Sequence, residues 1–141
     1  MNVTLNPLQS NTGVGTLTLA TSVDLTGKEN CLLKIVNDSG TPKFALPTAV
    51  TDIAPFICAR GGTTSDNSVA ETPWATHTCR IKLFGTCVPG DKLCLNSDSY
   101  GSVYVPAGSA GSLLVEYIAL EPGVSGQYVL CVPIPPRLVT F

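Results

Sequence analysis

Glycine and proline recur so often in this sequence that they leave little room for long regular helices. The 141-residue chain contains 13 Gly and 11 Pro. Both residue types interrupt helices, because proline lacks the backbone donor and glycine costs backbone entropy. The apolar segments between them are short, and none sustains apolar positions at helical spacing. Short apolar segments separated by turn residues are typical of an all-β protein.

Several of these segments alternate apolar and polar residues, which is the period of a β-strand. Cys79, Ile81 and Leu83 share one face of such a segment, and Arg80 and Lys82 share the other. We therefore expect an all-β fold, a small β-barrel or sandwich of short antiparallel strands. The expected strands are residues 16–20, 31–36, 43–46, 55–59, 78–84, 92–95, 102–105, 113–120 and 127–132, with a core that includes Leu83, Leu93, Leu95, Val115, Leu120 and Val132.

The remaining segments define the predicted domain organisation. Residues 16–141 are expected to form a single β domain, preceded by a flexible N-terminal arm over residues 1–15 that lacks a sustained pattern. Residues 60–73 are rich in Gly, Thr, Ser, Asn and Asp, which predicts a long surface loop. Residues 133–141 are expected to be a Pro-rich C-terminal tail, because proline cannot donate to a strand ladder. A short helical turn fits residues 47–52.

The N-terminal arm carries apolar residues that its own segment cannot bury. Val3, Leu5, Pro7 and Leu8 stand among Asn and Thr, and an extended segment of this kind adds a strand to a neighbour's exposed sheet edge. Trp74 is a second candidate contact, because aromatic residues dominate binding hot spots. The alternative is that this Trp packs locally under the neighbouring loop. We take these five residues as the candidate interface to a partner protein or between subunits.

The six cysteines are predicted to be reduced and buried. No C-x-x-C pair is present, which argues against a zinc site or a thioredoxin-like motif. The first residues have neither the positive region nor the apolar region of a secretory signal, so we expect folding in a cytoplasm, where thiols stay reduced. Free cysteines of this kind usually pack as small hydrophobic residues. They are Cys31, Cys58, Cys79, Cys87, Cys94 and Cys131.

Charged residues are scarce in this chain. They make up 13% of it, against about 25% in a typical soluble domain. The low charge leaves two interpretations open, a neutral polar surface or a surface partly covered by other protein chains. The net charge of −2, with no basic stripe, argues against nucleic-acid binding. No apolar stretch reaches the length that spans a membrane.

The sequence holds no recognisable catalytic or cofactor motif. The G-x-S-x-G nucleophile elbow is absent, and residues 13–15 lack the third glycine of a dinucleotide site. Residues 96–101 faintly match a calcium loop, but the twelfth position is Ala107 instead of the bidentate Glu. The single histidine, His77, belongs to no cysteine-hydrolase signature. We therefore expect no catalytic residues, no metal, no cofactor and no enzyme activity.

Three stretches of the C-terminal half follow a familiar order. They are residues 88–95 (VPGDKLCL), 101–103 (GSV) and 118–129 (IALEPGVSGQYV). This order resembles the PGD-x-L-x-L, G-x-V, ALE-x-x-x-x-G-x-x-V progression of tailed-bacteriophage capsid decoration proteins, also called head cement proteins. The match covers roughly residues 84–134.

The resemblance implies a small β-barrel that assembles as a homotrimer on the outside of a phage capsid and clamps neighbouring capsid subunits, without catalysis. We therefore expect a structural virion protein on the capsid surface, assembled in the host cytoplasm. Its expected partners are the major capsid protein and itself. The alternative is a tail or fibre module that binds a host glycan, for which Trp74, Tyr100 and Tyr104 would form an aromatic platform. A small cysteine hydrolase that uses His77 is a third hypothesis.

Overall fold

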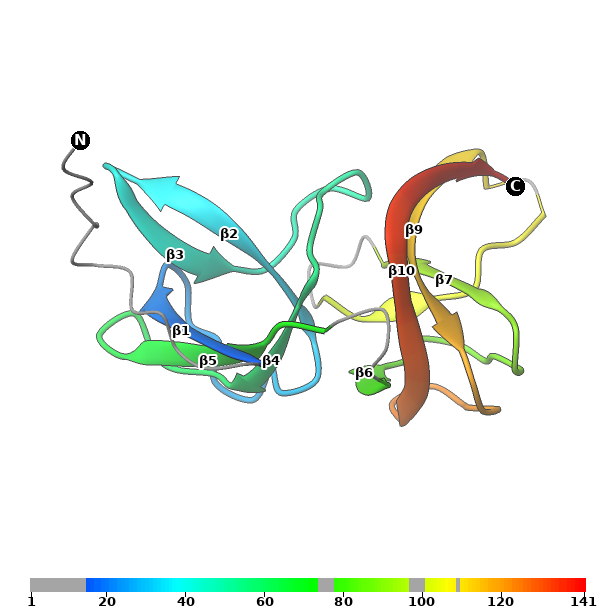
Figure 1. Cartoon of the computed structure of the whole chain (residues 1–141), viewed down its shortest axis with the longest axis horizontal. Helices are drawn as coiled ribbons and strands as arrows, with labels where there is room; N and C mark the ends of the chain where they lie inside the picture. Colours follow the sequence, from blue (N-terminus) through cyan, green and yellow to red (C-terminus); the bar gives the residue numbers. More distant parts are fainter. Residues whose placement is uncertain (1–14, 74–77, 97–100, 109) are drawn as a thin grey trace, which may run out of the picture.

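The protein has an all-β fold, as the sequence predicts (Figure 1). The computed structural model describes residues 15–73, 78–96, 101–108 and 110–141. These residues form ten strands and no α-helix. Accordingly, no helix long and apolar enough to cross a bilayer occurs in this part of the chain. The strands make two units that lie side by side, a closed barrel from the first half of the chain and a five-stranded sheet from the second half.

The first five strands close into a barrel in the order β1-β3-β2-β4-β5. They are β1 (Thr16–Thr21), β2 (Leu32–Asp38), β3 (Thr41–Ala45), β4 (Phe56–Arg60) and β5 (Asn67–Glu71). Strands β2 and β3 form an antiparallel hairpin, and β3 also pairs with β1 in parallel. This parallel pair departs from the expected antiparallel arrangement. Strand β2 lies between β1 and β3 in the sequence and is antiparallel to β3, so the chain has reversed direction before it reaches β3 and β3 can run in the same direction as β1.

Strand β5 corrects the interpretation of residues 60–73 as a long surface loop. It pairs with β1 on one side and β4 on the other, and so closes the barrel. Its fully buried side chains, Ser68 and Ala70, are small. The Ser68 hydroxyl shares a 2.6 Å hydrogen bond with the buried hydroxyl of Thr21. A strand that buries serine and alanine carries no hydrophobic signature, so its composition indicates a loop.

The last five strands form a sheet in the order β6-β10-β9-β7-β8. They are β6 (Cys79–Lys82), β7 (Lys92–Leu95), β8 (Val103–Tyr104), β9 (Ser112–Ala119) and β10 (Tyr128–Thr140). Strand β10 pairs with β9 along two stretches, with a register shift between Pro133 and Arg137. Residues 133–141 are therefore mostly strand and not a Pro-rich tail. The prolines fall at the shift, where the ladder is interrupted and amide donors are not required.

Strand β2 joins the barrel to the second sheet. Leu33 belongs to the barrel core, together with Phe44, whereas Leu32 belongs to the core of the second sheet, together with Ile81. Successive side chains of a strand point to opposite faces, so one strand supplies both cores. The Leu32 amide also donates a 2.8 Å hydrogen bond to the carbonyl of Gly101, from the second half of the chain.

Most of the predicted core is buried, and two of its members are not. Leu120 is 41% exposed, and Val132 is half-buried. The cause is strand alternation: Ala119 and Cys131 point inward, so the next residue in each case points away. The predicted core residues that are buried are Leu83, Leu93, Leu95 and Val115.

All six cysteines are buried, which confirms their predicted environment. Cys79 and Cys131 are register partners on β6 and β10, with their Sγ atoms 3.6 Å apart. The hydrogen bond with Cys79, together with burial, raises the pKa of Cys131. Burial is also the main cause that raises the pKa of Cys58 to about 12 and that of Cys94 to about 11. Thiols in such surroundings are protonated at neutral pH and are poor nucleophiles.

Candidate interaction surface

Two turn segments, residues 84–91 and 120–127, lie side by side at one end of the second sheet. Cys87 and Gly123 exchange both of their backbone hydrogen bonds, with N–O distances of 3.1 and 3.0 Å. Leu83, directly before the first segment, makes two further backbone bonds of 2.8 Å to the end of the second. The two segments are therefore held as one hydrogen-bonded edge.

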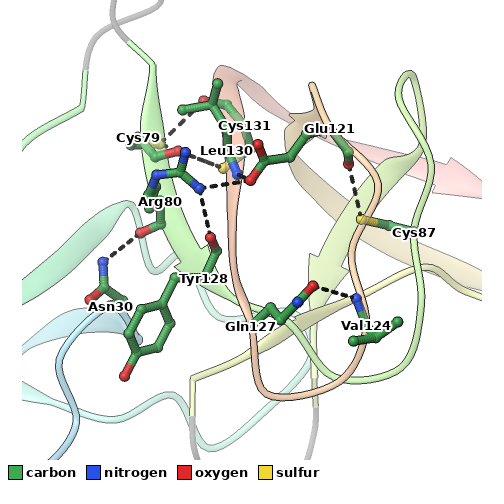
Figure 2. Close-up of polar contacts among 10 residues, drawn as sticks. All are labelled: Asn30, Cys79, Arg80, Cys87, Glu121, Val124, Gln127, Tyr128, Leu130 and Cys131. Carbon is green, nitrogen blue, oxygen red and sulfur yellow. Dashed lines mark hydrogen bonds and ion pairs between the residues drawn. The ribbon is translucent and has the colours of Figure 1, made fainter.

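Both segments contain a tight turn of the same construction, V-P-G-D beginning at Val88 and V-S-G-Q beginning at Val124. In each turn the side chain of the fourth residue accepts a hydrogen bond from the amide of the valine. The Oδ2 atom of Asp91 lies 2.8 Å from the Val88 amide. The Oε1 atom of Gln127 lies 3.0 Å from the Val124 amide, as Figure 2 shows. The third residue is glycine, with φ of +92° and +89° respectively, as a type II turn requires.

Gly123 allows the two turn segments to approach each other. A Cβ atom at this position would lie 2.3 Å from Cγ1 of Val129 and 3.1 Å from Cδ2 of Leu83. Both neighbours are buried in the core of the second sheet. Only a residue without a side chain fits here, so the glycine is a packing requirement of this edge.

Five large apolar side chains are exposed on and beside the two turns, and we call them the paired-turn surface. Their exposed fractions are 53% for Phe84, 57% for Val88, 41% for Leu120, 54% for Val124 and 49% for Tyr128. Val88 and Val124 directly follow Cys87 and Gly123, the two residues that pair across the turns, and Tyr128 is the register partner of Lys82. Neighbouring exposed apolar residues of this kind are typical of a site that other proteins cover.

A polar network fixes this surface to the sheet (Figure 2). Oε1 of Glu121 accepts hydrogen bonds from Nη1 of Arg80 at 2.7 Å and from the Leu130 amide at 2.9 Å. The same Nη1 donates to the carbonyl of Tyr128 at 2.9 Å. The Leu130 amide and the Arg80 guanidinium hold the pKa of the Glu121 carboxyl below its usual value. Because Nδ2 of Asn30 donates to the Arg80 carbonyl at 2.9 Å, the network also reaches the barrel.

The paired-turn surface includes none of the candidate interface residues that were chosen from the sequence. Val3, Leu5, Pro7, Leu8 and Trp74 lie outside the described residues, so their predicted role stays a prediction. The same holds for His77 and for Tyr100. Tyr104 is described, and it is half-buried beside the cluster of Cys94, Leu113 and Val115. Among the described residues, no group of three or more His, Cys, Asp or Glu side chains is placed to hold a metal ion.

Two sequence patterns mark the paired-turn surface, although the alternation of apolar and polar residues along the strands does not reveal it. The stretches 88–91 and 118–129, which carry the resemblance to capsid decoration proteins, meet at this edge. The repeated V-x-G pattern followed by a side-chain acceptor marks both turns. That the two turns pair with each other depends on the sheet order, which no local pattern encodes.

The fold is shared with a protein of a phage head. Among solved structures, the chain is similar to the N base of the head fiber gp8.5 of bacteriophage phi29, with a TM-score of 0.64 and 15% sequence identity. The likeness covers 84% of this chain and 92% of that one. No protein-family model matches the sequence, and no curated protein matches it. At this identity the likeness shows the fold alone.

Proposed function

We propose that the protein is a structural component of a phage virion that binds the outside of the capsid and stabilises contacts between capsid subunits. The observation that carries the proposal is the paired-turn surface, where five exposed apolar side chains stand on or beside two turns that are hydrogen-bonded to each other. The fold shared with a phage head fiber base supports the same assignment. The low content of charged residues also fits a surface that other chains cover. Such a role needs no catalysis and no cofactor.

The energetics favour attachment by several copies at once. Full burial of one large apolar side chain contributes roughly 1.5–3 kcal/mol, and these five are already about half buried, so together they contribute on the order of 4–7 kcal/mol. Association costs about 4–15 kcal/mol in lost translational and rotational freedom. One copy would therefore bind weakly. A homotrimer that engages neighbouring capsid subunits with three such surfaces gains the effective concentration that durable attachment needs.

Co-sedimentation with capsids tests the proposal. Capsids of the phage that encodes this chain, prepared without this chain, are incubated with wild type and with the double variant Phe84→Ser/Tyr128→Ser. Ile35→Ser is the matched control, because Ile35 is 41% exposed on the barrel, away from the turns. We expect wild type and Ile35→Ser to co-sediment and the double variant to stay in the supernatant. Capsid binding by the double variant at wild-type occupancy would refute the assignment of this surface.

A deletion separates the paired-turn surface from the N-terminal arm. Strand β1 begins at Thr16 and pairs with β5 over residues 16–20 and with β3 at residues 20 and 21, so removal of residues 1–12 should leave the fold intact. If the arm supplies part of the contact through Val3, Leu5 and Leu8, the truncated protein binds capsids more weakly than wild type. The native mass of each variant, measured in parallel, checks that a trimer is present.

A further inference from the structure

Cys79 and Cys131 form a pair of thiols that the proposed function does not use. They lie directly opposite each other on β6 and β10, although 52 residues separate them in the sequence. Residues in this position of an antiparallel pair have Cα atoms about 4.5–5.5 Å apart, and a disulfide spans Cα separations of about 4.4–6.8 Å. The register of the two strands therefore suits a disulfide between these cysteines.

The side chains of the two cysteines already meet. Their Sγ atoms are 3.6 Å apart, which is direct contact between the sulfur atoms (Figure 2). Sγ of Cys79 also lies 3.7 Å from the carbonyl oxygen of Cys131, and Sγ of Cys131 lies 3.5 Å from that of Cys79. A disulfide bond is about 2.05 Å long, so the sulfur atoms must approach by about 1.5 Å, which rotation of the two side chains supplies.

The two thiols differ in exposure and in acidity, and this sets the order in which they react. Cys79 is 7% exposed on a four-residue strand at the edge of the sheet, whereas Cys131 is fully buried. The hydrogen bond from Cys131 lowers the pKa of the Cys79 thiol, although burial opposes the shift. Oxidation begins at the thiol with more thiolate character and more exposure, so Cys79 reacts first and Cys131 resolves the product.

We propose that Cys79 and Cys131 are an oxidation site, at which a peroxide converts the two thiols into a cross-strand disulfide. In the first step the Cys79 sulfur attacks one oxygen of hydrogen peroxide, the O–O bond breaks, and Cys79 sulfenic acid and one water are formed. In the second step the Cys131 sulfur attacks the Cys79 sulfur, its proton passes to the leaving hydroxyl group, and a second water is released. The two thiols lose two electrons and two protons, and one peroxide is reduced to two waters.

The disulfide fastens β6 to β10 directly beside the paired-turn surface. Arg80 and Leu130, which are the chain neighbours of the two cysteines, both donate hydrogen bonds to Glu121 in the second turn segment. Disulfides persist outside the reducing cytoplasm, which is where a released virion protein acts. That benefit rests on the proposed function, whereas formation of the bond does not depend on capsid binding.

Peroxide treatment of the reduced, folded full chain tests the proposal. Hydrogen peroxide is added in stoichiometric amount, left for several hours and removed with catalase, and only then is the protein unfolded in urea for a count of free thiols. We expect the count to fall from six by two. Peptide mapping without reduction should show one bond, between the peptides that carry Cys79 and Cys131. An unchanged count, or a bond between two other cysteines of the folded protein, would overturn the proposal.

A pair of variants locates the bond independently of the peptide map. Cys79→Ala removes the thiol that reacts first, so its free-thiol count should not change on the same treatment. Cys94→Ala is the matched control, because Cys94 is also buried but lies on β7, and this variant should still lose two thiols. A loss of two thiols by folded Cys79→Ala would contradict the assignment. The peptide map of wild type decides the question even if Cys79→Ala does not fold.

Discussion

The amide of Leu32 and the carbonyl of Gly101, 2.8 Å apart, connect strand β2 of the barrel to the chain that leads into β8. Gly101 has φ of +70°, and a Cβ atom there would lie 2.4 Å from the backbone oxygen of Leu32. The contact between the two units therefore depends on a residue without a side chain.

Gly101→Ala should destabilise the protein by at least about 2 kcal/mol, because it combines a left-handed backbone with a clash against backbone atoms. The matched control is Gly108→Ala: no atom lies within 4 Å of its Cβ position, and its φ is not in the left-handed region. That control should stay within about 0.5 kcal/mol of wild type. Urea unfolding of both variants measures the difference. Equal urea midpoints for the two variants would contradict the close approach of residue 101 to the backbone of Leu32.

Two leucines with the same predicted role should behave differently on truncation. Leu93 is fully buried and Leu120 is 41% exposed. Leu93→Ala should cost about 2–5 kcal/mol, because it leaves a cavity in the core of the second sheet. Leu120→Ala should cost less than about 1 kcal/mol. Thermal unfolding of the two variants provides the test, and a larger loss for Leu120→Ala would contradict the strand alternation described here.

Alternation along single strands is the part of this fold that the sequence predicts best. In β6, Cys79 and Ile81 are buried and Arg80 is exposed, as period two requires. The limit of such reasoning is that a strand's partners lie far away in sequence. Strand β5 is recognisable only from its place between β1 and β4, and β10 continues past its prolines because a register shift accommodates them.

Sequence reasoning has the same limit for the candidate sites, because the residues that meet there are far apart in the chain. The Pro-Gly turn after Val88 is visible in the sequence, yet its pairing with the turn after Val124 follows from the order of strands in the sheet. Glu116 is the one charged residue in the apolar run of β9, which is a signal that sequence reasoning passes over. Its burial results from the Ala54 segment, which packs on it from 62 residues away in the sequence.

The buried thiols should resist modification in the native protein. Burial of Cys58 and Cys94 keeps them protonated at pH 8, since their pKa values are raised to about 12 and about 11. With a thiol reagent such as Ellman's reagent at pH 8, native protein should react at fewer than one of its six cysteines in the time that urea-unfolded protein reacts at all of them. Rapid reaction of one thiol, lost in a His77→Ala variant, would instead favour a cysteine hydrolase.

The Asp52 carboxyl should contribute to stability at neutral pH and lose that contribution in acid. Hydrogen bonds from Lys34, at 2.7 Å, and from the Thr48 amide lower its pKa to about 2. A depressed pKa stabilises the folded state above the unfolded value near 3.8, and the stability falls as pH drops from there toward 2. Since the pair is partly exposed, the loss should be about 1 kcal/mol. Urea midpoints of wild type and Asp52→Asn, measured at pH 5 and pH 2.5, should differ at pH 5, and the difference should shrink to less than half at pH 2.5, where Asp52 is partly protonated in the folded state.

The contribution of the Glu116 carboxyl to stability should depend on pH in the opposite sense to that of Asp52: it is present in acid and is lost as pH rises. Burial raises its pKa from 4.5 to about 7, although the Ala54 amide opposes the shift. Between these two values the folded state binds more protons than the unfolded state, so the free energy of unfolding falls as pH rises. The contribution is fully present below pH 4.5 and lost above pH 7, and it amounts to about 3 kcal/mol. Cys94 and Tyr117 interact with this carboxyl, but burial raises the pKa of each, so both stay protonated across the window.

Glu116→Gln isolates this contribution from every other group that titrates in the same range. The variant cannot ionise at residue 116, so its stability should change less between pH 5 and pH 8 than that of wild type. Wild type should lose about 2.5 kcal/mol relative to the variant over that interval, which begins above pH 4.5 and so omits part of the full contribution. Urea unfolding at half-unit pH steps gives both curves. Parallel curves for the two proteins would mean that Glu116 ionises in the folded state as readily as in the unfolded chain, and that a partner within the protein already satisfies its second oxygen.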